Sequence, residues 1–285
     1  MLKKSSNLIA NRLESLLSNI GDMALKRRAR MIVQGLDLKD GDSVLDIGCG
    51  DGYYLYLLSN LGIKLKLVGI DNDKNALDSA KEKFSDDRIN LINADILHKL
   101  PLVNNSFNKI IMSEVAEHLV DDFKGFNQVY RILKPGGIIC ITVPNADYPI
   151  LWDPVNWILE KLFSYHIRSG FWSGIWNQHI RLYKKEKLEI LVKKTGFKIL
   201  DSCSYTWWSL PFNHYLVNLT ARLIHREGSP KKIITAINKF NKVGYKKPTI
   251  IKYFFKAISL NDKINDLFKF KSIGVGIFIK ALKQK

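Results

Sequence analysis

Residues 44–52 read Val44-Leu45-Asp46-Ile47-Gly48-Cys49-Gly50-Asp51-Gly52, and this stretch decides the fold. An apolar run enters a glycine-rich turn, and apolar residues at helical spacing follow over residues 53–61. Glycines in such a turn permit positive φ and let the backbone approach a ligand closely. The N–H groups that open the following helix then face that ligand. The stretch therefore predicts a strand, a ligand-binding turn and a helix.

The spacing of the glycines narrows the kind of ligand. Gly48, Gly50 and Gly52 form G-x-G-x-G, and Tyr53 stands where a dinucleotide fingerprint has its third glycine. No Gly-Lys-Ser/Thr follows, which excludes a phosphate-binding P-loop.

Short apolar runs alternate with helical patterns around this stretch, which predicts a parallel α/β sheet. Strands are expected at residues 43–47, 65–70, 89–94, 109–112 and 138–143, and helices at 53–61, 74–84 and 121–133. Lys134-Pro135-Gly136-Gly137 is predicted to be the turn between a helix and a strand. Further along, residues 184–195 predict a helix, and residues 197–203 and 273–282 predict two more strands.

Two more carboxylates follow predicted strands. Asp71, in Gly69-Ile70-Asp71-Asn72-Asp73, can accept both hydroxyls of a ribose. Asp95, in Asn93-Ala94-Asp95-Ile96, can accept from an adenine amino group. Each of these carboxylates, taken alone, is equally consistent with a solvent-exposed turn residue. The glycine turn, Asp71 and Asp95 follow consecutive predicted strands, which indicates a nucleoside-binding edge of the sheet.

Five blocks in fixed order resemble the core of class I S-adenosylmethionine-dependent methyltransferases: VLDIGCGDG, GIDND, NADI, FNKIIMSEVAEHL and RILKPGGIICITVPN. The resemblance is to the methyltransferase type 11 group that contains the quinone-biosynthesis methyltransferases. It covers residues 43–143 and the last helix and strands. It implies a Rossmann-like α/β fold, with a seven-stranded sheet, helices on both faces, and an antiparallel final strand from residues 273–282.

The same resemblance implies S-adenosyl-L-methionine as the cofactor. Asp46, Gly48 and Gly50 are then expected to cradle its methionine part, Asp71 its ribose, and Asp95 with Ile96 its adenine. The remaining cofactor-binding residues expected are Cys49, Asn72 and Ser113.

The end of the fourth strand bears on the acceptor. Methyl transfer is an in-line displacement, so positioning supplies much of the catalysis, and a base is needed only for an acceptor that loses a proton. Residues 112–118, Met-Ser-Glu-Val-Ala-Glu-His, stand where methyltransferases of planar amide or adenine nitrogens carry Asn/Asp-Pro-Pro-aromatic. The absence of that motif disfavours such nitrogen acceptors.

Two histidines are the candidate catalytic residues. Histidine is a residue type that can act as a base in catalysis, and His118 is expected near the transferred methyl, with a packing or capping role as the alternative. His179 and Arg181 resemble a His-x-Arg-x-aromatic segment beside the substrate mouth of this family, with a structural hydrogen bond as the alternative. Glu117 is interpreted as a surface or hinge carboxylate.

The cysteines and the N-terminus bear on the compartment. Cys49, Cys140 and Cys203 are widely spaced without a CxxC pair, which favours a reducing compartment and predicts neither a disulfide framework nor a zinc site; no metal ligands are assigned. Polar residues soon after Met1 do not predict a secretory signal. A cytoplasmic protein is expected.

Charge and aromatic residues gather outside the core. The net charge is +17, and residues 222–285 hold 16 Lys and Arg against 3 Asp and Glu. The expected organisation is an N-terminal helical segment (1–42), a cofactor-binding core (43–204) with an aromatic substrate-side insertion (145–180), a basic aromatic insertion (205–270), and the final strand and tail (271–285).

The basic insertion suggests what the chain contacts. Residues 207–219 are predicted to form an interfacial helix, and residues 250–258 mix bulky apolar side chains with lysines, a composition that suits anionic lipid. Ordinary packing is the alternative for both. No run reaches the roughly 18–20 apolar residues of a spanning helix. Peripheral attachment at the inner membrane face is therefore the hypothesis.

The expected function is methylation of a small, lipid-like or isoprenoid acceptor. An RNA methyltransferase that uses the basic tail is less favoured, because the bulky apolar content suits lipid better than phosphate. A non-catalytic binding protein on this fold is the third alternative, disfavoured by the presence of Asp46, Asp71 and Asp95. The sequence leaves the target atom and the oligomeric state open.

Overall fold

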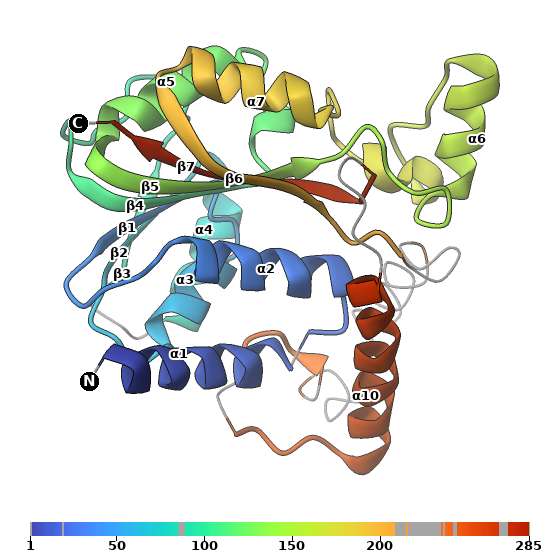
Figure 1. Ribbon diagram of the computed structural model, residues 1–285, viewed down its shortest axis with the longest axis horizontal. Helices are drawn as coiled ribbons and strands as arrows, with labels where there is room; N and C mark the ends of the chain where they lie inside the picture. Colours follow the sequence, from blue (N-terminus) through green and yellow to red (C-terminus); the bar gives the residue numbers. More distant parts are fainter. Residues whose placement is uncertain are drawn as a thin grey trace.

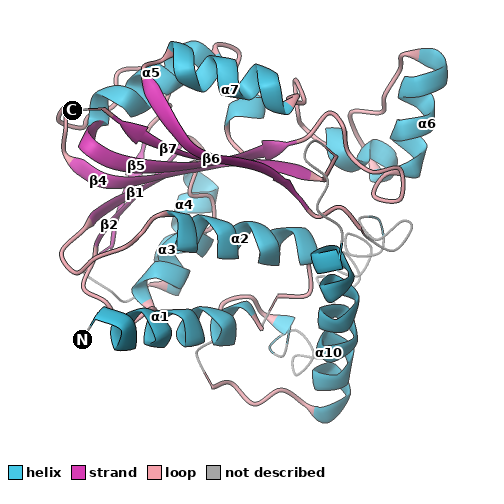
Figure 2. Ribbon diagram, viewed as in Figure 1, coloured by secondary structure: helices cyan, strands magenta, loops and turns pink. Residues whose placement is uncertain are grey.

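A seven-stranded sheet forms the centre of the chain (Figures 1 and 2). The computed structural model describes residues 2–18, 20–84, 89–208, 215, 235, 237–241, 244–267 and 273–284, and side chains from residue 8 onward. The strands are β1 Ser43–Ile47, β2 Lys66–Asp71, β3 Ile89–Asn93, β4 Phe107–Ser113, β5 Leu133–Pro144, β6 Phe197–Tyr205 and β7 Gly276–Lys283. The α-helices are α1 Leu2–Leu17, α2 Met23–Gly35, α3 Tyr53–Ser59, α4 Lys74–Lys83, α5 Asp122–Ile132, α6 Pro154–Phe163, α7 Lys185–Lys194 and α10 Thr249–Ile264. Short 3-10 helices are η1 Ala116–His118, η2 Phe171–Trp176 and η3 Asn265–Leu267.

The strand order is β3-β2-β1-β4-β5-β7-β6. Strands β1 to β5 run parallel, and β7 pairs antiparallel with both β5 and β6. The predicted seven-stranded sheet with an antiparallel final strand is confirmed. The order reverses between β1 and β4, and such a switch point opens a crevice at the carboxyl ends of the strands.

Helices cover both faces of this sheet (Figure 1). Helices α1 to α4 pack on one face, in a core that includes Leu16, Leu55 and Leu77. Helices α5 and α7 pack on the other, around Phe126 and Leu188. Because side chains alternate along a strand, β1 supplies residues to both cores and is buried on both of its faces.

Several predicted boundaries differ from the observed ones, most of all at the start of β5. The expected turn at residues 134–137 lies inside β5: Phe107 pairs with Leu133 and Lys109 pairs with Ile138, so the extra residues form a bulge in one strand. Within this bulge Gly136 has a φ of 78°, a conformation that suits glycine. The last strand begins at Gly276 and not at residue 273.

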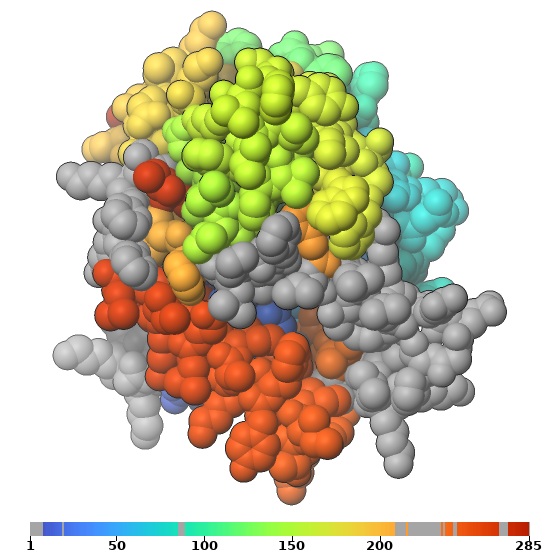
Figure 3. Space-filling model, turned by 90° about the vertical axis from the view of Figure 1, so that its right-hand side faces the viewer, coloured from blue at the N-terminus to red at the C-terminus, as the bar shows by residue number. Residues whose placement is uncertain are grey.

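Helix α6 belongs to the aromatic insertion and α10 to the basic one. Figure 3 shows α6 and α10 on the same face. The side chain of Arg27 in α2 pairs with the buried Asp262 and with Asp266, which ties α10 to the N-terminal helices. Most of the interfacial helix predicted over residues 207–219 lies outside the described residues. Within the described ranges, no helix combines the length and apolar character that a membrane crossing demands.

Candidate functional site

A cavity of about 440 Å³ lies at the carboxyl ends of β1, β2 and β3. Six of the nine residues expected to bind the cofactor line it: Gly48, Gly50, Asp71, Asn72, Asp95 and Ile96. It is also lined by His118, the candidate base, and by Glu114, Val115 and Gln178, which were not predicted.

The glycine turn forms one wall of this cavity. The N–H groups of Gly48 and Cys49 both donate to the carbonyl of Ile70, at 2.8 and 3.0 Å, which fixes the turn against β2. Gly48 has a φ of 67°, and a Cβ there would lie 2.4 Å from the side chain of Val115. Gly50 has a φ of 50° with nothing within 4 Å of its Cβ position, so its backbone faces open space.

The two strand-end carboxylates are held by backbone N–H groups. Gly50 donates to Asp71 Oδ2 at 2.8 Å, and Asp73 donates to Asp71 Oδ1 at 2.9 Å. Leu97 donates to Asp95 Oδ1 at 2.8 Å. Each carboxylate oxygen has a second lone pair, so these bonds orient the carboxylates and leave capacity for a ligand's hydroxyl or amino groups.

Asp46 lies behind the turn and is 1% exposed. Its Oδ2 has no hydrogen-bond partner among the described residues. Burial, with a smaller effect of Asp71 and Asp51, raises the pKa of Asp46 well above its ordinary value. A cation bound at the turn would stabilise the ionised form of the Asp46 carboxyl group. The site therefore fits the positively charged methionine part of S-adenosylmethionine.

Cys49 and Ser113 are the other expected cofactor residues that do not line the cavity. Ser113 Oγ is bonded to Tyr54 Oη at 3.0 Å and to Thr142 Oγ1 at 2.9 Å. Burial raises the pKa of the Cys49 thiol far above its usual range. In the described structure both side chains therefore contribute to the packing behind the cavity.

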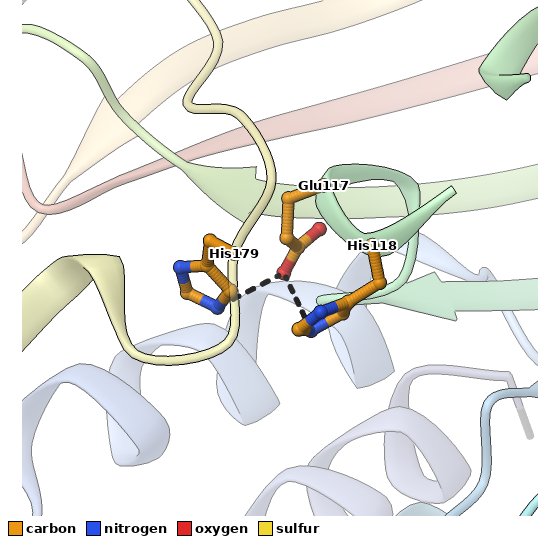
Figure 4. A group of neighbouring side chains, drawn as sticks. All are labelled: Glu117, His118 and His179. Atoms are coloured by element: carbon orange, nitrogen blue, oxygen red, sulfur yellow. Dashed lines mark ion pairs between the residues drawn. The ribbon is translucent and has the colours of Figure 1, made fainter. Parts of the chain in front are cut away.

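The two candidate catalytic histidines meet at Glu117 (Figure 4). Nε2 of His118 and Nε2 of His179 each lie 3.9 Å from Glu117 Oε1, and the two rings are 4.9 Å apart. Glu117 is 0% exposed, so its interpretation as a surface carboxylate was wrong. Burial, reinforced by the charge of Glu114, raises the pKa of Glu117 well above its ordinary value.

A second cavity of about 260 Å³ lies on the other side of these residues. It is lined by His179, Arg28, Glu114, Trp152 and Tyr205, among others, and Glu114 lines both cavities. Arg28 Nη1 lies 2.7 Å from Glu114 Oε2. No sequence pattern indicates Arg28, because it reaches this cavity from the N-terminal helix α2.

The segment that carries His179 is fixed to η1 and α5. Ile180 N donates to the carbonyl of Glu117 at 3.2 Å. Arg181 Nη1 and Tyr183 Oη both bond to Asp122 Oδ2, at 2.7 and 2.6 Å. Arg181 thus positions its neighbours, and the His-x-Arg-x-aromatic pattern holds His179 beside the cavities.

Comparison with known proteins agrees with this geometry. The family described as "Methyltransferase domain" matches residues 38–196. A demethylmenaquinone methyltransferase of Oceanobacillus iheyensis is 29% identical over 211 residues, which cover 70% of this chain and 87% of the relative. A cycloartenol-C-24-methyltransferase of Arabidopsis thaliana is 29% identical over 203 residues, 67% of this chain and 57% of the relative.

A solved structure shares the fold. Phosphoethanolamine N-methyltransferase 2 of Haemonchus contortus, in complex with S-adenosyl-L-methionine, matches with a TM-score of 0.55 at 22% identity. The match covers 91% of this chain and 53% of that one.

Proposed function

The chain belongs to the S-adenosylmethionine-dependent methyltransferase family, and from that premise we propose that it methylates a small, lipid-like or isoprenoid acceptor. The observation that carries the proposal is the pair of cavities that meet at Glu114. One holds the residues suited to the cofactor, and the other faces the aromatic insertion.

The chain's own residues bind and orient the reactants. S-adenosylmethionine supplies an electrophilic methyl group. We assign the ribose to Asp71, the adenine to Asp95 and Ile96, and the methionine part to the turn above Asp46. Because both strand-end carboxylates are already oriented by backbone N–H groups, little ordering is needed on binding.

The acceptor class rests on the second cavity and on the relatives. Trp152, Ile175 and Val275 contribute apolar wall to this cavity and belong to a separate buried cluster with Tyr148. The two relatives named above are methyltransferases of a quinone and of a sterol-type compound by their names. The same cavity is lined by Arg28, Glu114 and His179, so it suits an acceptor that has both an apolar part and a polar group.

The test is transfer of a labelled methyl group. The full chain is incubated with labelled S-adenosylmethionine and, separately, with lipid, RNA, protein and water-soluble fractions of a cell extract. The proposal expects label in the lipid fraction. Label confined to RNA or to protein would contradict it.

We further propose that α10 docks on an anionic membrane surface. Its side chains Ile250, Tyr253, Phe254 and Leu260 are 85, 66, 58 and 55% exposed. Their spacing places them along one side of the helix, and an exposed apolar stripe of this kind marks an interaction surface.

Lysines flank the same helix. A cavity of about 700 Å³ beside α10 is lined by Lys26, Lys246, Lys247, Lys252 and Lys256, together with Asp262. Burial lowers the pKa of Lys26. A site that gathers this much positive charge suits phosphate head groups, at about 1 kcal/mol for each cationic side chain near the surface.

Liposome co-sedimentation tests the docking. The chain is expected to pellet with vesicles of phosphatidylglycerol and phosphatidylcholine, and less with phosphatidylcholine alone. Replacing Tyr253 and Phe254 together by serine should reduce pelleting, whereas Ile190→Ser, at a 65% exposed residue of α7, should not. Equal pelleting of all three proteins would refute the role of α10.

A further inference from the structure

Three potential ligand atoms converge between the two cavities. The imidazole nitrogens of His118 and His179 and a carboxylate oxygen of Glu117 all lie within 4.8 Å of one another. The side chain of His118 is 40% exposed and lines the cofactor cavity, whereas His179 lines the second cavity. Figure 4 shows both rings directed toward Glu117 from different segments of the chain. The group therefore stands where the methyl donor and the acceptor would meet.

Backbone carbonyls fix the tautomer of both rings. Nδ1 of His118 lies 3.1 Å from the carbonyl of Gln178, and Nδ1 of His179 lies 2.5 Å from the carbonyl of Ile175. A carbonyl oxygen only accepts, so each Nδ1 carries the hydrogen and, in the neutral ring, each Nε2 carries a lone pair. Histidines that bind metals are oriented by the same arrangement, since the second ring nitrogen donates to a carbonyl or carboxylate.

Glu117 completes the set. The distances of 3.9 Å from its Oε1 to each Nε2 exceed those of a hydrogen bond. Neither of its carboxylate oxygens has a well-formed hydrogen bond to the described residues, although the side chain is fully buried. A buried carboxylate without hydrogen bonds requires a compensating cation or a proton.

The spacing suits one metal ion. With metal–ligand bonds of about 2.1 Å, neighbouring ligand atoms of a tetrahedral site are about 3.4 Å apart. Each nitrogen–oxygen pair must then close by about half an ångström. Two histidines and one carboxylate are the donor set of catalytic sites that keep positions open for substrate.

We propose that Glu117, His118 and His179 bind a divalent cation of the first transition series, whose open positions hold a hydroxyl oxygen of the methyl acceptor. Binding of the ion stands independently, while its role toward the acceptor rests on the proposed function. The acceptor is thereby restricted to hydroxyl-bearing compounds, and the product to a methyl ether.

The reaction balances without a further reagent. The ion's charge lowers the pKa of the acceptor hydroxyl, and the proton passes to solvent. The electron pair of the oxygen forms the bond to the methyl carbon, and the carbon–sulfur bond breaks with its pair passing to sulfur. A methyl ether, S-adenosylhomocysteine and a proton are released.

Metal titration of the full chain, stripped with chelator, tests the site. Zn²⁺ is expected to bind in competition with a chromophoric chelator, and Co²⁺ to give the visible absorption of a nitrogen–oxygen site. Ca²⁺, which prefers oxygen ligands, should bind weakly. Glu117→Gln, His118→Gln and His179→Gln should each weaken Zn²⁺ binding at least about 100-fold.

A matched control is present in the chain. His166 Nδ1 lies 3.7 Å from Glu160 Oε1, a histidine–glutamate pair outside the proposed site. His166→Gln should bind Zn²⁺ like the wild type. Thermal unfolding monitors the fold of each variant, and His118→Gln, at a partly exposed residue, carries the test if Glu117→Gln does not fold. Equal Zn²⁺ affinity in the wild type and all three site variants would overturn the site.

Binding of the cofactor separates this inference from the proposed function. Glu117→Gln should bind S-adenosylmethionine like the wild type while losing Zn²⁺; loss of both in a folded variant would contradict a separate metal site. Failure of the wild type to bind S-adenosylmethionine would overturn the proposed function, whatever the metal result. Addition of 1,2-dihydroxybenzene should shift the visible absorption band of the Co²⁺ form. An unchanged band would overturn the proposal that the ion holds a hydroxyl oxygen of the acceptor.

Discussion

The cofactor cavity and the second cavity are built in different ways. The first is made by residues that lie at the ends of consecutive strands, and its key hydrogen bonds join the ends of neighbouring strands, as Gly50 to Asp71. The second is lined by residues that are distant in sequence: Arg28 of α2 pairs with Glu114, and Val275 lies on its wall with Trp152. The difference explains why a pattern of strands reveals the first site and only the folded chain reveals the second.

Long-range ion pairs are expected to hold α10 against the N-terminal helices. Breaking one of them should therefore cause the largest loss of stability. Asp262→Ala removes a buried partner of Arg27, and the free energy of unfolding should fall by about 3 kcal/mol because the guanidinium loses a buried carboxylate. Asp266→Ala removes the exposed partner of the same guanidinium, and should cost under about 1 kcal/mol. Equilibrium urea unfolding measures both, and equal losses would contradict the assigned role of Asp262.

On the cofactor side, backbone geometry should matter more than side-chain partners. Gly48→Ala should lower the free energy of unfolding by about 2 kcal/mol or more, since positive φ disfavours a side chain and the new methyl meets Val115. Gly50→Ala has the same φ problem without the contact, so its loss should be smaller, about 1 kcal/mol. Denaturant unfolding of the two variants gives the comparison, and the reverse order would refute it.

A third change should act on the insertion alone. Asn156 is fully buried, and its side chain donates to Asp153 and to the carbonyls of Trp172 and Ser173, while it accepts from Ile167 N. Asn156→Ala should speed amide hydrogen exchange across α6 and η2 by about 10-fold, equivalent to about 1.4 kcal/mol. Exchange in β1 to β3 should not change. Faster exchange in both regions would show that they unfold together.

The sequence predicted the sheet and most of the cofactor cavity for a physical reason. Buried parallel strands need apolar runs, and a tight turn at positive φ needs glycine, so both leave local patterns. The prediction of a turn at residues 134–137 was wrong, because the same glycines lie in a bulge of β5. Glu117 was misplaced because the sequence does not reveal that η1 is covered by the segment carrying His179.

The proposed metal site also could not be predicted from the sequence. The spacing of the three cysteines disfavours a zinc site with cysteine ligands. It carries no information about a site with histidine and glutamate ligands. His118 and His179 are far apart in sequence, and hydrogen bonds such as those from Ile180 N to Glu117 and from His118 to Gln178 hold their segments together. Ligand sets assembled across such distances have no local signature.

The cavity beneath Gly48 and Gly50 is expected to bind S-adenosylmethionine through Asp71. Calorimetric titration of the cofactor into the full chain tests it directly. The wild type should bind, and Asp71→Asn should bind about 10- to 100-fold more weakly, because hydrogen bonds to a charged group contribute about 1.5–3 kcal/mol. Asp78→Asn, at an exposed carboxylate of α4, should bind like the wild type. Absence of binding to the wild type, or equal affinity in Asp71→Asn, would contradict this assignment of the cofactor site.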